Sequence, residues 1–568
     1  MNLNLKAKQK NSYDAIVIGS GMSGGWAAKE LCEKGLRTLV LERGRAVEHR
    51  KDYPTSMSDP WDFLHRGRLT KREREENPIA SRHFDESYKH FVVKDKEHPY
   101  ESVKPFSWIR GYQTGGRSLL WGRWTQRWSD LDFEANAREG IGVDWPIRYR
   151  DIAPWYSYVE KFVGISGNRD GIPHLPDGEF LPPFEMNCLE KHMKQSIEAH
   201  HPQRHLIISR TANLSEAQKV HLKLGRSNCQ ARHLCHRGCP FGASFCSNSA
   251  TIPAARATGN LSLVNDVVVQ EVLYDPEKER AKGVRVIDNT GTVTEFSAKI
   301  IFVNASTINT ALILLNSTSD RFPQGLGNDS GTLGHYLMDH NYRGRVAGEY
   351  DGFQDRYYSG RRPTGVYVPR FRNVGNDKQR DFLRGYAYAC SASRTGWWEG
   401  VAGTDFGADF KEALTHPGKW RFYMGGMGEM LPEYANHVSL DTSRTDKWGM
   451  PLLKISCSFG DNENNMTRDI LDSAAEMMEQ AGLRVISQND SQEAPGSAIH
   501  EMGTARMGRD PRSSVLNKWN QMHQVPNVFV TDGACMTSSA CQNPSLTYMA
   551  LSARAADFAV RELKRRNL

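Results

Sequence analysis

A glycine-rich turn near the N-terminus constrains the fold of this chain more than any other feature. Residues 14–18 form a short apolar run, and Gly19, Gly21 and Gly24 follow with the spacing GxGxxG before a helix-like stretch at 26–34. Gly19 permits a tight turn, Gly21 lets the backbone approach a pyrophosphate, and Gly24 lets the helix pack closely on the strand. The pattern predicts an α/β fold that binds a dinucleotide at the N-terminus of this helix.

An acidic residue stands where the second strand of such a unit should end. Glu42 follows the apolar run 38–41 and lies eighteen residues after Gly24, so it is placed to accept hydrogen bonds from ribose hydroxyls. The next residue, Arg43, is a candidate contact for adenine. A lone GxGxxG is often an ordinary glycine turn, but strand, helix, second strand and acid in this order favour a dinucleotide site.

Composition and charge exclude some partners. The 568 residues include 73 basic and 66 acidic side chains, a net charge of +7, and no long basic run precedes the C-terminal 564–566. This distribution is too diffuse to predict nucleic-acid binding. No apolar stretch is long enough to span a membrane, and residues 1–11 are polar. We therefore expect no membrane span, and any export would depend on a partner.

Three of the ten cysteines lie close together in the sequence. Cys229, Cys235 and Cys239 have the spacing C-x5-C-x3-C and are followed by a proline. Soft thiolates on a tight loop suit an iron–sulfur cluster or a zinc ion, and we favour the cluster over zinc, a disulfide or free thiols. Cys246, seven residues further on, is a fourth ligand, a bystander or half of a disulfide. A redox metal beside a dinucleotide predicts a dehydrogenase that passes electrons onward.

Periodicity predicts further elements along the chain. A second glycine-rich stretch at 111–122 contains the pair Gly115 and Gly116, which brings backbone close to a bulky neighbour. Residues 50–100 read as an irregular excursion or cap. We expect helices at 153–163, 309–315 and 465–481, and strands at 261–273, 281–288, 299–303 and 365–371.

The C-terminal fifth carries a second group of motifs. His500 begins the pattern HxxGT, a strand and turn at 527–534 contains Asp532, and Asn543-Pro544 opens a helix. Together with the fingerprint, the Gly115 pair, the turn 304–306 and the segment 331–340, these motifs resemble the glucose–methanol–choline oxidoreductase family over nearly the whole chain. The resemblance implies a Rossmann-like FAD-binding domain with an interleaved α+β substrate domain. The implied boundaries are 1–50, 100–145, 225–340 and 495–568 for the FAD domain, and 51–99, 146–224 and 341–494 for the substrate domain, with the cysteine loop 229–246 at the junction.

The resemblance also implies the catalytic pair. In that family, the histidine of HxxGT and a His or Asn eleven residues after the strand-end Asp face N5 of the flavin, and these positions are His500 and Asn543 here. Oxidation of an alcohol moves a hydride to the flavin while the hydroxyl proton leaves. A neutral imidazole can take that proton, and an amide can donate a hydrogen bond to the alcohol oxygen. Leu119 and Leu120 occupy the stretch where relatives often tether FAD through a histidine, so we expect non-covalent FAD.

The same matches imply the contacts of the cofactor. The expected FAD-binding residues are Gly19, Gly21, Met22, Ser23, Gly24, Glu42, Arg43, Gly115, Gly116, Ser118, Trp121, Gly122, Val267, Val268, Ala305, Asp532, Gly533, Asn543 and Pro544.

The cysteine loop narrows the resemblance to the catalytic subunits of bacterial sugar dehydrogenases. In these, a three-iron (3Fe-4S) cluster passes electrons to a cytochrome, and a small companion subunit carries the export signal. The resemblance makes Cys229, Cys235 and Cys239 the cluster ligands. It implies a cytochrome c-type acceptor and a periplasmic location with the companion subunit, the cytoplasm being the alternative.

The substrate follows least directly from the sequence. The chain looks most similar to glucoside 3-dehydrogenases, which oxidise the 3-hydroxyl of glucosides and disaccharides. Oxidation of glucose at C1 or gluconate at C2 is the alternative, and a redox-inactive flavin scaffold in a respiratory assembly is an alternative of another class. Aromatic faces for a pyranose are offered by Trp121, Trp124, Trp128, Trp397 and Trp398.

Overall fold

The computed structural model describes residues 11–357, 364–394 and 406–568, and the glycine fingerprint follows the first strand of its largest sheet. This sheet contains β1 (Ser12–Ile18), β2 (Thr38–Leu41), β7 (Leu261–Val264), β8 (Val267–Asp275), β9 (Arg280–Asp288), β10 (Val293–Val303) and β18 (Val528–Val530). β7, β2, β1, β10 and β18 are parallel neighbours in that order. The N-terminal half of β10 pairs instead with β9 in an antiparallel ribbon that ends in β8. Because parallel strands present their carboxyl ends together, the turn after β1 and the turn after β18 lie at one edge.

The single strand expected at 261–273 is in fact two strands. The chain turns at Asp266, which has a φ of 58° and donates its backbone N–H to the carbonyl of Gly44 at 3.0 Å. β7 therefore pairs with β2, whereas β8 pairs with β9. Asn265 and Asp266 are typical turn residues between the two apolar runs, and this signal was overlooked when the runs were read as one strand.

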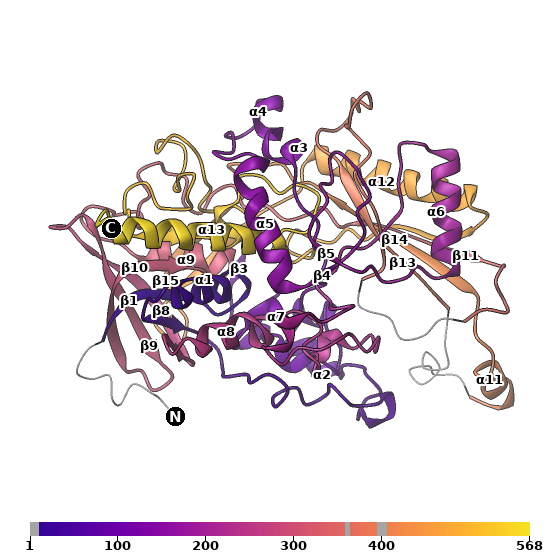
Figure 1. The fold of residues 1–568 in the computed structure, drawn as a ribbon, viewed down its shortest axis with the longest axis horizontal. Helices are drawn as coiled ribbons and strands as arrows, with labels where there is room; N and C mark the ends of the chain where they lie inside the picture. Colours follow the sequence, from indigo (N-terminus) through magenta and orange to yellow (C-terminus); the bar gives the residue numbers. More distant parts are fainter. Residues whose placement is uncertain (1–10, 358–363, 395–405) are drawn as a thin grey trace.

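Helices cover the parallel sheet. The helix of the fingerprint, α1 (Met22–Glu33), packs against the long C-terminal helix α13 (Ser545–Lys564) and against α8 (Thr251–Ala257). Figure 1 shows α13 (yellow) beside α1 and α5 (Tyr149–Val163). Another helix, α9 (Thr307–Asn316), starts directly after β10 and packs on β8. The helices expected at 26–34, 153–163 and 309–315 are therefore confirmed with small changes of boundary.

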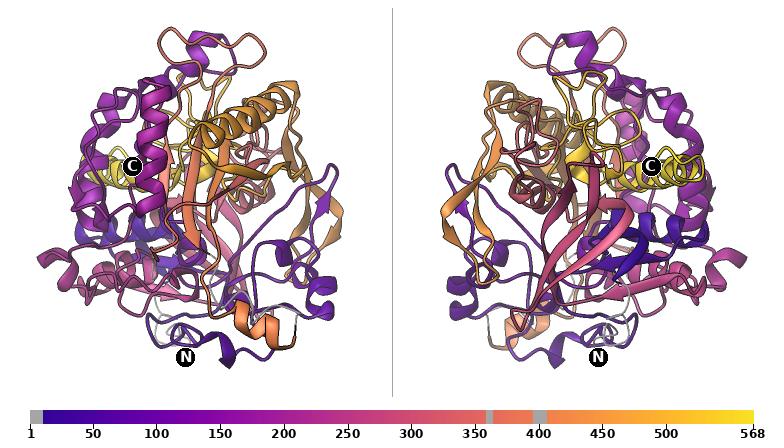
Figure 2. Two further views of the ribbon diagram at one scale, coloured as in Figure 1. Left: turned by 90° about the vertical axis from the view of Figure 1, so that its right-hand side faces the viewer. Right: turned by 90° about the vertical axis from the view of Figure 1, so that its left-hand side faces the viewer.

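A second, antiparallel sheet lies at the other end of the molecule (Figure 1). Its order is β17 (Arg484–Asp490), β11 (Gly344–Tyr350), β14 (Trp420–Gly428), β13 (Tyr386–Arg394), β12 (Val366–Val368) and β6 (Ile207–Ile208). Two helices, α12 (Asp461–Gln480) and α6 (Cys188–His200), pack on this sheet, and Figure 2 shows α12 beside its orange strands. The buried side chains of this sheet form a core separate from that of the parallel sheet.

Short elements connect the two sheets. Residues 51–99 contain only one-turn helices and α2 (Lys71–Glu76), as the irregular composition predicts. β15 (His437–Thr445), β16 (Pro451–Ser456) and β3 (Glu101–Ser102) form a small three-stranded sheet. The remaining short elements are α3 (Asp130–Phe133), α4 (Ala135–Glu139), β4 (Ile165–Ser166), β5 (Phe180–Leu181), α7 (Lys219–Leu222) and α11 (Ala408–Ala413). The α/β fold class expected from the sequence is confirmed, whereas the domain boundaries stay a prediction.

Candidate active site

One cavity at the carboxyl edge of the parallel sheet gathers most of the residues expected to bind the cofactor. Its lining includes His500 and the following residues of the expected set: Gly19, Gly21, Met22, Ser23, Glu42, Arg43, Gly116, Ser118, Trp121, Gly122, Val267, Val268, Ala305, Asp532, Gly533 and Asn543. These residues come from eight separate stretches of sequence, so the fold brings together what the motifs predicted separately.

Three expected contacts lie outside the lining. Gly24 lies in α1, where a Cβ would collide with the carbonyl of Gly19, so its contribution is close packing of helix on strand. Gly115 has a φ of 88° and packs against the side chain of Asn248. Pro544 precedes the first turn of α13. Gly24 and Gly115 therefore shape the cavity from behind.

A hydrogen bond connects the glycine-rich turn after β1 with the turn that contains Gly115. Gly115 donates its backbone N–H to Ser20 Oγ at 2.9 Å, and Ser20 Oγ in turn donates to Glu42 Oε2 at 2.6 Å. Glu42 Oε1 accepts the backbone N–H of Gly44 at 3.0 Å. Burial raises the pKa of Glu42, and these hydrogen bonds oppose the shift. Glu42 thus fixes the turn between β1 and α1 as well as facing the cavity.

The first turn of α1 has the character of an anion site. Its N-cap, Gly21, supplies no side chain, and no acidic residue lies in the first turn. The amide N–H groups there and the positive end of the helix dipole favour a phosphate. The structure therefore fits the pyrophosphate of a dinucleotide at this position.

Arg43 lies between two aromatic rings. Its guanidinium is 4.4 Å from the ring centre of Tyr112 and 4.8 Å from that of Trp448, and it pairs with Asp446 at 3.7 Å. This stack gives Arg43 a fixed orientation at the end of the cavity near Glu42.

The predicted catalytic pair is brought together. Asn543 Nδ2 lies 3.3 Å from His500 Nε2, and both side chains line the cavity. Burial lowers the pKa of His500 well below its usual value, and the charges of His340 and Arg117 add to this shift. The imidazole is therefore neutral near pH 7, the state that can accept a proton.

A buried histidine that sequence reasoning missed lies behind His500. His340 Nδ1 is 2.9 Å from His500 Nδ1, and the two rings meet edge to face. His340 Nε2 is 3.1 Å from the carbonyl oxygen of Ser539 and 3.0 Å from that of Ala540. Burial lowers the pKa of His340 to about 4. The motif segment 331–340 ended on this residue, but the sequence alone gave it no role.

One carboxylate, that of Asp339, binds the backbone of the loop that contains His500. Asp339 accepts the backbone N–H groups of Gly496, Ala498 and His500 at 2.7, 3.1 and 3.0 Å. Burial raises the pKa of Asp339 to about 7, with the charge of Glu501 adding to it and these hydrogen bonds opposing it. Asp339 therefore fixes the backbone that aims His500 into the cavity.

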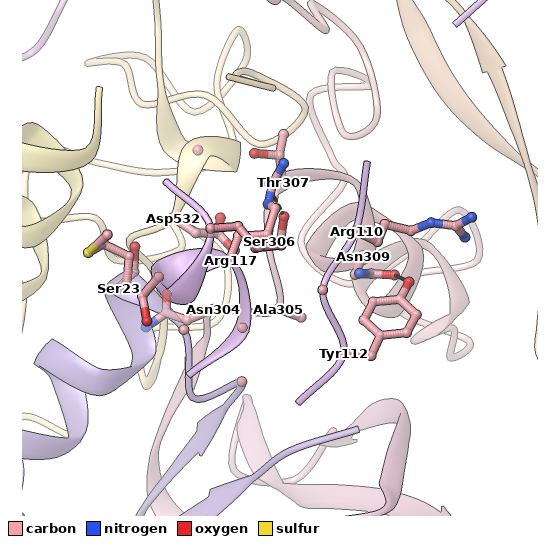
Figure 3. A pocket seen from close by; sticks show the side chains of 18 of the residues that line it. Ser23, Arg110, Tyr112, Arg117, Asn304, Ala305, Ser306, Thr307, Asn309 and Asp532 are labelled. Atoms are coloured by element: carbon pink, nitrogen blue, oxygen red, sulfur yellow. Dashed lines mark hydrogen bonds between the residues drawn. The ribbon is translucent and has the colours of Figure 1, made fainter. Parts of the chain in front are cut away.

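Arg117 is a further cavity residue that the motifs did not single out. It pairs with Glu501 at 2.7 Å and donates to Ser306 Oγ at 2.8 Å, next to Asp532. Figure 3 shows Arg117 between Asp532 and the turn 304–306, with Arg110, Tyr112 and Asn309 on the other side. A cation lining a dinucleotide cavity offers charge to the cofactor or to a developing anion.

The tryptophans divide by location. Trp121 and Trp124 line the cavity, and Trp121 Nε1 donates to the carbonyl of Phe245 at 2.9 Å. Trp128 is fully buried against Phe133 and is a core residue, so it is not available for stacking on a sugar. Trp397 and Trp398 lie outside the described residues.

The cysteine loop is less well defined as a metal site than the sequence led us to expect. Over residues 11–357, 364–394 and 406–568, no group of three or more His, Cys, Asp or Glu is arranged to hold a metal ion. Nor do any of the ten cysteines form a disulfide, and Cys246 Sγ lies 3.3 Å from Ser249 Oγ. Burial raises the pKa of Cys235 to about 12; Arg123 opposes the shift, and Cys239 and Cys229 add to it. Cys229 and Cys239 pack against the same small apolar cluster, which contains Leu214 and Ala243.

Two buried guanidinium groups flank these thiols. Arg123 and Arg226 are each 1% exposed, and no carboxylate is among the groups that act on either guanidinium in the described part of the chain. Burial lowers the pKa of Arg226 to about 10, and the thiols of Cys246 and Cys239 oppose the shift. Backbone carbonyls accept hydrogen bonds from both groups, those of Leu119 and Cys235 from Arg123 and that of Gly242 from Arg226.

Comparison with known proteins places this geometry in a family. Two models of GMC oxidoreductases match the chain, one over residues 13–342 and the other over 432–552. The chain belongs to the GMC oxidoreductase family. It is therefore an oxidoreductase, and its cofactor is FAD. The first turn of α1, which has no side-chain cap and no acidic residue, and the glycine turns fit this cofactor.

Individual relatives cover the chain from end to end. It is 28% identical to 2-methyl-1,2-propanediol dehydrogenase of Mycolicibacterium austroafricanum, over 96% of this chain and 94% of that protein. It is 24% identical to the fructose dehydrogenase large subunit of Gluconobacter japonicus, over 97% and 98%. The crystal structure of pyridoxine 4-oxidase from Mesorbium loti has a TM-score of 0.60 at 16% identity, covering 96% and 99% of the two chains, which confirms the fold.

Among the helices of the described residues, none combines the length and apolar character required to cross a bilayer.

Proposed function

We propose that this protein is an FAD-dependent dehydrogenase that oxidises a secondary hydroxyl of a sugar or glycoside. The observation that carries the proposal is the His500–Asn543 pair, 3.3 Å apart, in the cavity that also contains the glycine fingerprint. FAD, when bound, supplies the acceptor for the hydride that leaves the alcohol carbon.

The residues of the chain supply the rest of the chemistry. His500 Nε2 takes the hydroxyl proton, and Asn543 Nδ2 donates a hydrogen bond to the alcohol oxygen as its negative charge develops. Arg117, held by Glu501, adds positive charge at the same cavity. The buried surroundings exclude water and strengthen each of these interactions.

A sugar is the proposed substrate class. The relative from Gluconobacter japonicus is named for fructose, and Trp121 and Trp124 offer aromatic faces to a pyranose at the cavity wall. Within this class we propose C3 of glucosides and disaccharides as the oxidised position, with a 3-keto product. The support for C3 is the resemblance of the cysteine loop and its surroundings to glucoside 3-dehydrogenases.

We propose that electrons leave through an iron–sulfur cluster, 3Fe-4S by resemblance, held by Cys229, Cys235 and Cys239. The proximity of the thiols and the two buried guanidinium groups support an anionic centre there. The proposal includes a cytochrome c-type acceptor and a small companion subunit that carries the protein to the periplasm. The relative from Gluconobacter japonicus is named as a large subunit, which supports a companion subunit here.

A substrate screen with an artificial electron acceptor tests the function. The decisive comparison is glucose against methyl glucoside, because a methyl group on the anomeric oxygen blocks oxidation at C1 but leaves C3 available. We expect turnover of both, with a 3-keto product identified by NMR. Turnover of glucose alone would support the C1 alternative, and no dye reduction with any sugar would overturn the proposed substrate class.

A further inference from the structure

The surroundings of His340 determine which of its nitrogens carries the proton. His340 Nε2 faces two carbonyl oxygens, those of Ser539 and Ala540, at 3.1 and 3.0 Å. A carbonyl oxygen only accepts hydrogen bonds, so Nε2 must be the N–H of a neutral His340. Its Nδ1 therefore presents a lone pair, and that lone pair points at His500 Nδ1, 2.9 Å away.

This arrangement fixes the proton of His500 in turn. At 2.9 Å one of the two facing Nδ1 atoms must donate, and His340 Nδ1 has no proton to give while the ring is neutral. Burial keeps both rings neutral near pH 7. His500 consequently carries its proton on Nδ1, and its Nε2 lone pair faces Asn543 and the cavity.

We propose that His340 is a positioning residue that holds His500 in the tautomer whose Nε2 is the free base. The inference rests on the proposed function, since it assigns the proton acceptor of that reaction to one atom. When the alcohol O–H bond breaks, the new N–H bond forms at His500 Nε2, and the ring then carries protons on both nitrogens. The Nδ1–H···Nδ1 bond to His340 shares the resulting positive charge.

Two substitutions at position 340 separate the tautomer role from a role in folding. The amide oxygen of His340→Asn replaces Nδ1 as an acceptor, whereas the amide nitrogen of His340→Gln replaces Nε2 as the donor to the carbonyls of Ser539 and Ala540. The tautomer proposal predicts that His340→Gln lowers kcat at least about 100-fold with little change in KM, the size of a lost general base. His340→Asn should avoid most of that loss and keep most of the wild-type kcat.

The matched control is His221, which is equally buried and has the same pattern of contacts away from the cavity. Its Nδ1 accepts the backbone N–H of Gln218 at 3.0 Å, and its Nε2 lies 3.2 Å from the carbonyl of Lys161. His221→Gln should change stability without changing kcat. Equal losses in His340→Gln and His340→Asn, or a matching loss in His221→Gln, would overturn the tautomer proposal in favour of a structural role.

A second measurement reads the tautomer itself. In histidine-selective ¹⁵N NMR of the FAD-loaded enzyme, the His500 resonances, assigned by their absence in His500→Ala, should have the pattern of an Nδ1–H ring. In His340→Gln they should move to the pattern of an Nε2–H ring or of a mixture. An unchanged pattern would refute the proposal. Absence of dye reduction by the wild-type enzyme with any sugar would instead refute the proposed function, so the two failures are distinguishable.

Discussion

The histidine pair and the cysteine loop were both predicted from short motifs, yet the fold holds them very differently. His500 is fixed through its backbone by Asp339, through its ring by His340, and beside Asn543. The cysteine loop brings three thiols near one another and near Arg123, but not into metal-binding geometry among the described residues. Protein hydrogen bonds complete the first site, whereas the second would be completed only by the cluster that the proposed function includes.

The largest expected effect comes from removing the imidazole of the histidine site. We expect His500→Ala to lower kcat by about 10²–10⁴-fold, because the proton acceptor is removed. Steady-state dye reduction with a sugar substrate measures the loss, and the flavin absorbance spectrum checks that FAD remains bound. Turnover at the wild-type rate would mean that the base lies elsewhere.

Cys235→Ser tests whether the cysteine loop binds an iron–sulfur cluster. If the loop holds a cluster, this variant should lose most of its iron. Loss of a residue that only supports a ligand lowers metal affinity about 10–100-fold, and loss of a ligand itself should cost at least as much. Iron analysis and low-temperature EPR of anaerobically purified protein measure the loss, and reduction of FAD by substrate should persist.

The control for this variant is Cys188→Ser, on helix α6 and away from the loop. It should keep the iron content of the wild type. A wild-type enzyme that is free of metal and fully active would remove the relay from the proposed function.

A pH series sharpens the comparison, because the histidine pair is held neutral by burial. The pKa of His340 falls from 6.5 to about 4 on folding. The unfolded chain therefore binds more protons between these values, so this residue's contribution is present above pH 6.5 and is lost as the pH falls toward 4. Between pH 7 and pH 5 the loss is about 2 kcal/mol.

Urea denaturation of the wild type and of His340→Asn at pH 7 and pH 5 measures this contribution. The stability of the variant should fall less steeply than that of the wild type. Parallel declines would show that His340 is not responsible for the difference.

The smallest expected effect concerns the charge beside the thiols. In iron-depleted protein, Arg226→Met should raise the free energy of unfolding by about 1 kcal/mol, because it removes a buried cation that has no carboxylate partner. In iron-loaded protein the sign should reverse, since the cation then faces an anionic cluster. Thermal denaturation measures the effect of the substitution in the iron-depleted and the iron-loaded protein. A stabilising effect in both forms would argue against an anionic centre.

The fold was predictable from the sequence where the physical constraint is local. The glycines of the fingerprint impose a strand, a turn and a helix, and β2 was located residue for residue at Thr38–Leu41. The break at Asp266 was missed, because the apolar runs on both sides outweighed the turn signal of Asn265 and Asp266. The domain boundaries and the roles of the cofactor contacts stay predictions.

The sequence by itself determined the fingerprint, the cysteine spacing and the motifs that contain His500 and Asn543, since each depends on residues that lie near one another in the chain. Only the tertiary structure decided that His340, 160 residues from His500, lies behind its ring, and that Arg226 is buried beside the cysteines. The physical reason is that hydrogen bonds and charge burial depend on distances in space. These distances are fixed when the parallel sheet gathers distant turns at one edge.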